Sequence, residues 1–220
     1  MNTLTYIQLM GIYLSEGYVY VKGNSHKIVI YQKNRDLIMQ TILDSTKLNW
    51  KRRKECWDVT NNNLGKYLKI FGLAADKHVP EEIKNMPSRY IQEFIYCYTI
   101  GDGHIRKRIN GSIEHTLFTI SRKMADDFQE LAQKSGWNSS LRIVKPQKSI
   151  ILEDGVQRVI KNNGGYCITF KKRAKRAELL NRNFKKQHYN GIVYNPRVAH
   201  NHIIHIRRNG KPSWNGCFTP

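Results

Sequence analysis

The apolar positions of the chain form two similar series of helical and strand patterns. Residues 9–17 and 95–103 are both apolar runs of helical length that end in a small residue, a carboxylate and a glycine. The two carboxylates, Glu16 and Asp102, are separated by a suitable length for one compact repeat. The pattern therefore predicts that the two halves of the chain share one fold.

Each run is followed by a predicted β-hairpin and a helix. The hairpins combine β-branched and aromatic residues with a turn at Gly23-Asn24 in the first half and at Asn110-Gly111 in the second. Apolar residues at helical spacing predict the helices, and Ser121 is the expected N-cap of the second one. The expected strands are residues 18–22, 27–31, 104–109 and 116–120, and the expected helices are residues 34–48 and 122–134.

Further strands and a closing helix are expected in each half. The strands are residues 54–59, 139–144 and 166–170, and the helices are residues 63–71 and 174–181. We interpret residues 76–83, which include Pro80, as the connector between the halves. The predicted organisation is a first repeat with its linker (residues 1–87), a second repeat (residues 88–185) and a basic extension (residues 186–220) that contains a short hairpin of residues 191–194 and 203–206.

The charge of the chain indicates a polyanionic partner. Lys and Arg number 37 against 17 Asp and Glu, which gives a formal net charge of +20. Most of this excess lies after residue 87. Such an excess is not needed for folding, and it raises both the affinity and the encounter rate for nucleic acid. A membrane surface is the less favoured partner, because no long basic amphipathic helix is evident.

Several classes of protein are excluded by the same sequence. No apolar run is long enough to cross a bilayer, and residues 1–8 do not have the pattern of a signal peptide. The four cysteines, Cys56, Cys97, Cys167 and Cys217, form no CxxC pair, so neither a zinc ribbon nor a disulfide framework is expected. We therefore expect an intracellular protein (cytoplasm, nucleoid or organelle matrix) with no membrane partner.

Small residues on the two apolar runs predict that these helices pack closely. Gly11 and Ser15 share one face of the first helix, and Cys97 and Gly101 form the matching pair on the second. If these faces meet, the two terminal carboxylates come together, and a divalent cation relieves their repulsion. Carboxylate oxygens favour Mg²⁺, which can support phosphodiester hydrolysis. For either run alone, a buried helix that merely ends in an acid and a glycine is the simpler interpretation.

Both runs resemble the motifs of the LAGLIDADG homing endonucleases. LMGIYLSEG (residues 9–17) is similar to the first family motif and IYCYTIGDG (residues 95–103) to the second. Residues 27–38 and 117–137 resemble the hairpin strand and following helix of the two repeats. Residues 77–95 resemble the linker of single-chain and intein-associated members.

The resemblance covers residues 4–185 and implies an α+β fold. Two αββαββα repeats, related by a pseudo-twofold axis, would pack their helices on saddle-shaped antiparallel β-sheets that lie in the major groove. The implied protein is a monomeric, site-specific double-strand DNA endonuclease of a mobile genetic element. It would leave 3′ overhangs and use Mg²⁺, for which Mn²⁺ or Ca²⁺ could substitute. Cys97, with bulky Tyr96 and Tyr98, departs from the small residues of the second motif, so the helix crossing is expected to be adjusted.

The resemblance also implies roles for particular residues. The implied metal ligands are Glu16 and Asp102, with the backbone carbonyls of Ser15 and Gly101. Gln32 in the first repeat and Ser121 in the second stand where the family has a residue that orders catalytic waters. Lys171 or Lys172 stands where a basic residue supports the transition state, and Thr60 is at the matching place of the first repeat.

Alternate positions on the strands are expected to contact the bases, because Arg and Lys reach guanine edges and amides reach adenine. The candidates are Tyr18, Tyr20, Lys22, Lys27, Tyr31, Lys33, Arg52 and Lys54 in the first repeat and Arg106, Arg108, Arg142, Lys145 and Arg158 in the second. The basic run that includes Lys172 and Arg173 is expected to bind the phosphate backbone. For any single residue a solvated strand face is the simpler interpretation, so this prediction concerns the set.

Two alternatives stay open. Some proteins with this fold bind nucleic acid without cutting it, such as maturases that stabilise intron RNA. Residues 193–217 faintly resemble the C-terminal splicing block of inteins, so the chain could also be the endonuclease part of a decayed intein. The three histidines of this segment, His200, His202 and His205, fit no strong zinc pattern, and phosphate or solvent contacts are favoured for them.

Overall fold

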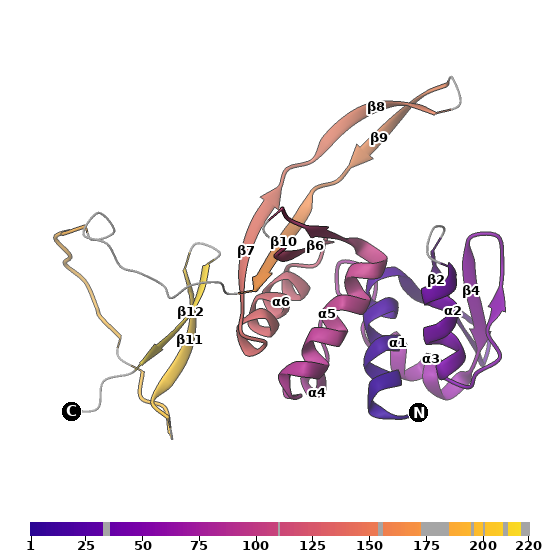
Figure 1. Ribbon diagram of the computed structural model, residues 1–220, viewed down its shortest axis with the longest axis horizontal. Coiled ribbons are helices and arrows are strands. Elements are labelled where there is room, and N and C mark those ends of the chain that lie inside the picture. The colour runs from indigo at the N-terminus through magenta and orange to yellow at the C-terminus, as the bar shows by residue number, and fades with distance from the viewer. Residues whose placement is uncertain are drawn as a thin grey trace.

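The computed structural model describes residues 1–32, 36–109, 111–153, 156–172, 185–194, 196–199, 201–208 and 211–216. Its two halves are each an antiparallel four-stranded sheet with helices on one face, and a separate hairpin stands near the C-terminus (Figure 1). Helices α1 (Thr3–Glu16) and α5 (Ser88–Asp102) lie side by side where the halves meet. The fold is α+β, as the sequence predicted.

The first half has the element order expected from its sequence. After α1 come β1 (Gly17–Lys22), β2 (Ser25–Tyr31), α2 (Asp36–Ser45), β3 (Lys51–Arg52), β4 (Cys56–Thr60) and α3 (Asn62–Lys69). The strands pair in the order β1-β2-β4-β3. Side chains cap two helices, because Asn2 accepts from the Thr5 amide at 2.8 Å and Asn61 accepts from the Leu64 amide at 3.0 Å.

The second half repeats this order and adds a short linker helix before it. Its elements are α4 (Glu81–Lys84), α5, β5 (Gly103–Lys107), β6 (Ile113–Thr119), α6 (Arg122–Lys134), β7 (Trp137–Val144) and β10 (Gly165–Lys172). The strand order is β5-β6-β10-β7, which matches the first sheet. Helix α6 has the predicted bounds, and Ser121 caps it by accepting from the Met124 amide at 3.1 Å. The predicted closing helix, residues 174–181, lies outside the described residues.

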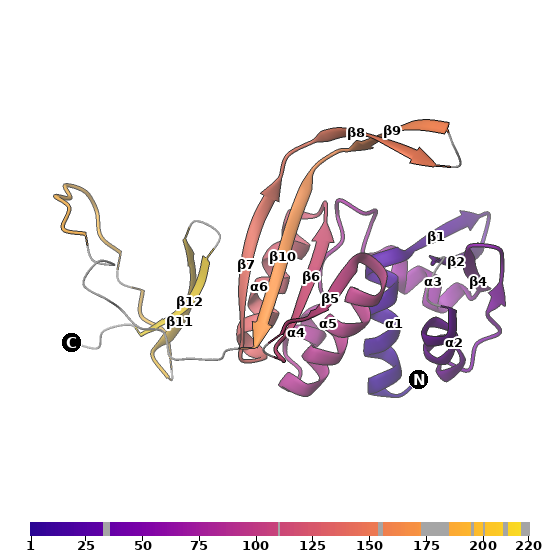
Figure 2. The same cartoon turned by 45° about the horizontal axis from the view of Figure 1, so that its top comes forward.

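Two strands of the second half were not predicted. Strands β8 (Gln147–Glu153) and β9 (Val156–Asn162) pair only with each other and connect β7 to β10. They form an arm that projects beyond the four-stranded sheet (Figure 2). The corresponding connection in the first half is a short turn between β3 and β4, and the Arg53 amide closes it by donating to the Cys56 carbonyl at 2.8 Å. The two halves therefore differ most at this connection.

The C-terminal hairpin differs from its prediction. Strand β11 (Ile203–Arg208) pairs with β12 (Lys211–Gly216), whereas residues 191–194 form no strand, so the predicted pairing of 191–194 with 203–206 was wrong. The hairpin is anchored on α6. Gln133 Nε2 donates to the Pro212 carbonyl at 3.4 Å, and Arg207 forms an ion pair with Asp126. In the part of the chain that the structure describes, no helix is long and apolar enough to cross a membrane.

The core is built around the two central helices. Buried Ile7, Met10 and Tyr13 of α1 pack in one cluster with Phe94 and Tyr98 of α5, and this cluster continues to α6 and both sheets. A second cluster joins the opposite side of α1 to α2 and to Trp57 of β4. Because α1 and α5 contribute to the cores of both halves, their packing fixes how the halves meet.

Candidate active site and nucleic-acid interface

The small residues of α1 and α5 meet as the sequence predicted. A methyl group at Gly11 would lie 2.6 Å from Cys97 Cβ, and one at Gly101 would lie 2.6 Å from Ser15 Cβ and 2.9 Å from Glu16 Cγ. All three separations are shorter than side chains tolerate, so the helix backbones are in close contact. Since residue 11 faces 97 and residue 15 faces 101, the helices run in the same direction and end together.

Glu16 and Asp102, the last residues of α1 and α5, therefore lie together at this end of the helix pair. Burial raises the pKa of Glu16 to about 7, and repulsion from Asp102 adds to the effect. Burial also raises the pKa of Asp102. Both acids are harder to ionise than in water, so a cation beside them would be favourable.

Lys77 is the cation that acts on both acids. Its Nζ donates to the carbonyls of Tyr13 at 3.1 Å and Gly17 at 2.8 Å, which places it at the end of α1. Its positive charge lowers the pKa of Glu16 and of Asp102, against the effect of burial. Lys77 was not predicted from the sequence, because a single lysine in a polar connector looks like an exposed one.

The donor set around the acids suits a hard divalent cation. Two carboxylates come from the helix ends, and the carbonyls of Ser15 and Gly101 belong to last turns, where carbonyls lack partners within the helix. Across the described ranges no group of three His, Cys, Asp or Glu could hold a metal, so the remaining ligands would be carbonyls and water. Mg²⁺ commonly binds in this way, with one or two carboxylates and several waters.

Part of the chain matches a known family model. Residues 89–174 match the model described as the LAGLIDADG-like domain. The second half of the chain is a LAGLIDADG-like domain. It runs from the start of α5 to the end of β10, and the first half has the same order of helices and strands up to α3.

Solved structures with related architecture were also found. The N-terminal LAGLIDADG domain of DUF199/WhiA is 8% identical, with a TM-score of 0.41 over 78% of this chain and 76% of that one. The homing endonuclease I-WcaI, bound to its DNA recognition sequence, is 12% identical, with a TM-score of 0.44 over 78% of this chain and 76% of its own. The search of curated proteins gave no match.

Gln32, the proposed water-ordering residue of the first half, reaches the end of α5. Its Nε2 donates to the Ile100 carbonyl at 3.4 Å, two residues before Asp102. Ser121 does not occupy the matching place in the LAGLIDADG-like domain. Gly17 pairs with Ile30 and Gly103 pairs with Leu117, so the residue that corresponds to Gln32 is Thr119.

Ser121 is instead fully buried and structural. Its hydroxyl donates to the Lys77 carbonyl at 2.6 Å and caps α6. Thr119 is also buried, and its Oγ1 accepts from the Ser121 amide at 3.1 Å. The predicted water-ordering role of Ser121 therefore has no support, because its hydroxyl is already engaged away from solvent.

The structure does not bring Lys171 to the acids. Gly103, next to Asp102, pairs with Leu117 of β6, and Leu117 pairs with Ile168 of β10. Lys171 lies three residues further along β10, where it pairs with Glu114. Its Nζ lies 3.5 Å from the Glu114 carboxylate. Lys171 is thus at the opposite end of the sheet from Asp102, and the matching residue of the first half is Thr60, as expected. The side chain of Lys172 lies outside the described residues.

The outer face of the first sheet, opposite the helices, carries most of the predicted DNA contacts. Tyr18, Tyr20, Lys22, Lys27 and Tyr31 alternate with buried or partly buried residues and lie on this face. Asp58 lies among them, 3.3 Å from Lys27 Nζ and 2.7 Å from Arg53 Nε. Burial raises the pKa of Asp58, but the bonds from Arg53 and Lys27 outweigh it and the pKa is lowered. Lys27 is therefore partly neutralised.

The remaining candidates of the first half are not on this face. Arg52 pairs with Trp57 and shares its face, which is the side covered by helices. Its guanidinium lies 5.3 Å from the Trp57 ring centre and donates to the Cys56 carbonyl at 3.2 Å. Arg52 is thus turned away from the outer face. Lys54 is exposed in the turn before β4, and Lys33 lies outside the described residues.

The LAGLIDADG-like domain has a comparable outer face. Arg106 and Arg142 are exposed on it, and Arg108 forms an ion pair of 2.6 Å with Glu114. Lys145 is exposed just beyond β7. Arg173 and the side chain of Arg158 lie outside the described residues. Each outer face therefore combines exposed cations with an acid that binds two basic side chains.

Proposed function

We propose that the chain is a monomeric, site-specific double-strand DNA endonuclease that requires a divalent metal. The observation that carries the proposal is the meeting of Glu16 and Asp102 at the ends of two closely packed helices, between two sheets with basic outer faces. The proposed organisation is two repeats, residues 1–87 and 88–185, followed by a basic extension. The proposal places the chain inside the cell, where duplex DNA is available.

The carboxylates would hold the metal, for which Mg²⁺ is the natural candidate and Mn²⁺ or Ca²⁺ the substitutes. When bound, such an ion polarises a phosphoryl oxygen and lowers the pKa of a water molecule. The protein supplies the geometry. Tight packing at Gly101 fixes the separation of the two acids, and Gln32 positions an amide beside the end of α5. Cleavage across the minor groove that leaves 3′ overhangs belongs to the same proposal.

The two outer faces would bind the duplex. Tyrosines and exposed cations at alternate strand positions can reach base edges or phosphates, while the acids Asp58 and Glu114 hold neighbouring cations in fixed positions.

Selection from a random library tests the proposal. The protein is incubated with a randomised duplex library and Mg²⁺, and cut ends are captured and sequenced. We expect one long motif with 3′ overhangs. Asp102→Asn should abolish cutting and leave duplex binding nearly unchanged, whereas Asp44→Asn, a matched change at an exposed site on α2, should cut normally. Duplex binding without cuts would favour the non-cleaving alternative, and normal cutting by Asp102→Asn would remove that residue from the mechanism.

A further inference from the structure

The C-terminal hairpin belongs to a part of the chain whose charged side chains are all basic. Residues 185–220 contain no Asp or Glu, and their basic residues are Lys185, Lys186, Arg197, Arg207, Arg208 and Lys211. The candidate active site uses none of them. This concentration of positive charge therefore needs an explanation of its own.

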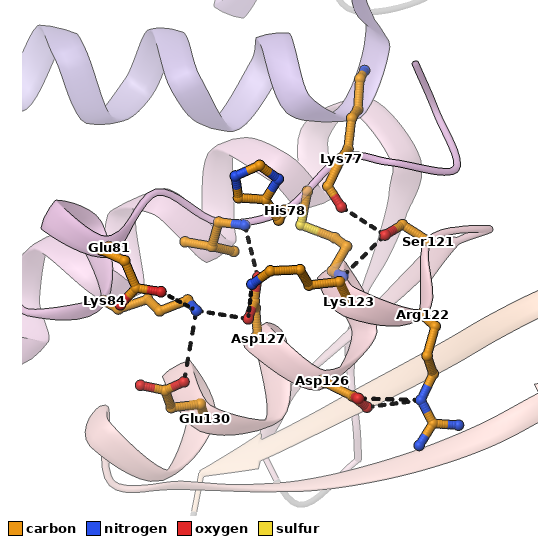
Figure 3. Close-up of polar contacts among 12 residues, drawn as sticks. Lys77, His78, Glu81, Lys84, Ser121, Arg122, Lys123, Asp126, Asp127 and Glu130 are labelled. Atoms are coloured by element: carbon orange, nitrogen blue, oxygen red, sulfur yellow. Dashed lines mark hydrogen bonds and ion pairs between the residues drawn. The ribbon is translucent and has the colours of Figure 1, made fainter. Parts of the chain in front are cut away.

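The hairpin is held in a defined position on α6. Arg207 of β11 forms an ion pair with Asp126 and donates to Gln129 Oε1 at 3.2 Å. Asp126 also binds Arg122 at 3.0 Å, on the side of α6 that faces away from the connector (Figure 3). The Pro212 carbonyl of β12 accepts from α6 as well. One strand of the hairpin is thus fastened by a charged side chain and the other by its backbone.

The two faces of the hairpin carry different cations. Residues that lie directly opposite each other in a strand pair share a face, and successive residues alternate between the faces. Arg207 is opposite Pro212, and the next pair is Arg208 with Lys211. Because Arg207 points to α6, Arg208 and Lys211 project together from the other face, and both are exposed.

The second pair of cations has no counter-ion among the described residues. The charge of Arg207 is balanced by Asp126, whereas Arg208 and Lys211 form no ion pair in the part of the chain that the structure describes. Like charges directly opposite each other on neighbouring strands repel and destabilise the pair. An anion held between them removes this repulsion, and a phosphate accepts hydrogen bonds from both a guanidinium and an ammonium group.

The position of the hairpin indicates which phosphate it would meet. Strand β12 contacts β7, the edge strand of the second sheet, and Arg142 is exposed on the outer face of β7. The hairpin lies beyond β7, at the end of the longest axis that is away from the first half (Figures 1 and 2). A duplex that crosses the outer face of the second sheet and continues past β7 reaches the hairpin next.

We propose that the β11–β12 hairpin is an additional duplex-binding element, in which Arg208 and Lys211 together hold a phosphate beyond the second sheet. The choice of duplex DNA as the partner rests on the proposed function. Cutting is not required for this contact, so the contact can be measured in EDTA, where a metal-dependent endonuclease is inactive.

The salt dependence of duplex binding tests the proposal. Fluorescence anisotropy measures the affinity of the full chain for a labelled duplex of random sequence over a series of salt concentrations in EDTA. Arg208→Gln with Lys211→Gln should weaken binding and reduce the slope of log affinity against log salt by about 0.9 for each phosphate that is released. Lys66→Gln with Lys69→Gln is the matched control, because it removes the same charge from exposed positions on α3 and should leave the slope unchanged.

Urea unfolding shows whether the two cations serve the fold instead. The Arg208 and Lys211 substitutions remove a repulsion, so the urea midpoint should stay the same or rise. A lower midpoint, an unchanged slope, or an equal change in slope from the α3 control would overturn the proposal. A loss of affinity for single-stranded RNA without a loss for the duplex would also overturn it. If the slope changes as expected but the protein never cuts DNA, the hairpin contact stands and only the endonuclease is rejected.

Discussion

At the scale of single residues, the site depends on the absence of a side chain. Gly101 lets Ser15 and Glu16 approach the backbone of α5, and this approach brings Glu16 to Asp102. Cys97, which departs from the usual motif, is small enough to face Gly11 and is fully buried. The bulky neighbours Tyr96 and Tyr98 are accommodated because Tyr96 is exposed and Tyr98 points into the core. The departure is therefore compatible with close helix packing.

Adding one methyl group at this helix crossing tests its importance. Gly101→Ala should lower the free energy of unfolding by about 1–3 kcal/mol, because the new group overlaps the Ser15 side chain and the packed helices cannot easily separate. Urea unfolding measures the decrease. Ser15→Gly combined with Gly101→Ala should recover part of it, since the swap removes the atoms nearest to the new methyl group. Wild-type stability of Gly101→Ala would mean that the helices do not pack as described.

At the scale of elements, the connector is an ordered part of the structure. Residues 77–84 bind α6 and its cap through several groups, among them the Lys77 carbonyl, the Val79 amide and the Lys84 ammonium. Ser121 makes hydrogen bonds with both α6 and the connector, because its hydroxyl caps α6 and donates to the Lys77 carbonyl. The relative position of the two halves thus depends on α6 as well as on the central helix pair.

The double role of Ser121 leads to a comparison of two helix caps. Ser121→Ala should lower the free energy of unfolding by about 2–3 kcal/mol, because it removes the cap and leaves the buried Lys77 carbonyl without its donor. Asn61→Ala removes only the cap of α3 and should cost about 1 kcal/mol. Thermal or urea unfolding of the two variants provides the measurement. Equal decreases would show that the hydrogen bond to Lys77 contributes nothing.

Elements with periodic apolar residues or a capping residue were predicted well, whereas elements that depend on tertiary contacts were not. The apolar stripe and Ser121 define α6 from local sequence alone. Strand β3 has only two residues, too few for a pattern. The arm and the C-terminal hairpin had a usable signal, because Asp154-Gly155 and Asn209-Gly210 stand between their strands, and such pairs are typical of hairpin turns.

The site was predictable only in part for a related reason. Small residues at helical spacing and repeated terminal acids predict the meeting of Glu16 and Asp102 directly. Lys77 is buried because both halves of the chain surround it, and its burial cannot be predicted from the neighbouring sequence. Lys171 was selected by family resemblance as a basic residue on the fourth strand of the repeat, but strand register decides which end of that strand lies beside Asp102.

At the scale of the whole molecule, the two sides of each sheet differ in polarity. The side that faces the helices packs into the apolar core, whereas the outer faces carry exposed polar side chains, among them Arg106, Arg142 and the tyrosines of β1. The C-terminal hairpin adds further cations beyond β7 (Figure 1). A duplex that lies across both sheets would meet positive charge along its length, so we expect binding that depends strongly on salt.

The face that binds DNA can be identified from this salt dependence. Arg106→Gln with Arg142→Gln should weaken duplex binding and reduce the slope of log affinity against log salt by about 0.9 for each phosphate that is no longer neutralised. Lys66→Gln with Lys69→Gln removes the same charge from α3, on the helix side, and should change the slope little. Fluorescence anisotropy over a series of salt concentrations measures both. A larger change in slope from the Lys66 and Lys69 substitutions would mean that the duplex binds on the helix side, which would contradict binding to the outer faces.

The most direct test of the central claim is a crystal structure of the protein with its selected duplex in the presence of Ca²⁺. We predict an ion about 2.3–2.6 Å from carboxylate oxygens of both Glu16 and Asp102, with the duplex across the outer faces of both sheets and the ion beside a phosphate. An ion bound elsewhere, or a duplex lying against the helices, would contradict the account.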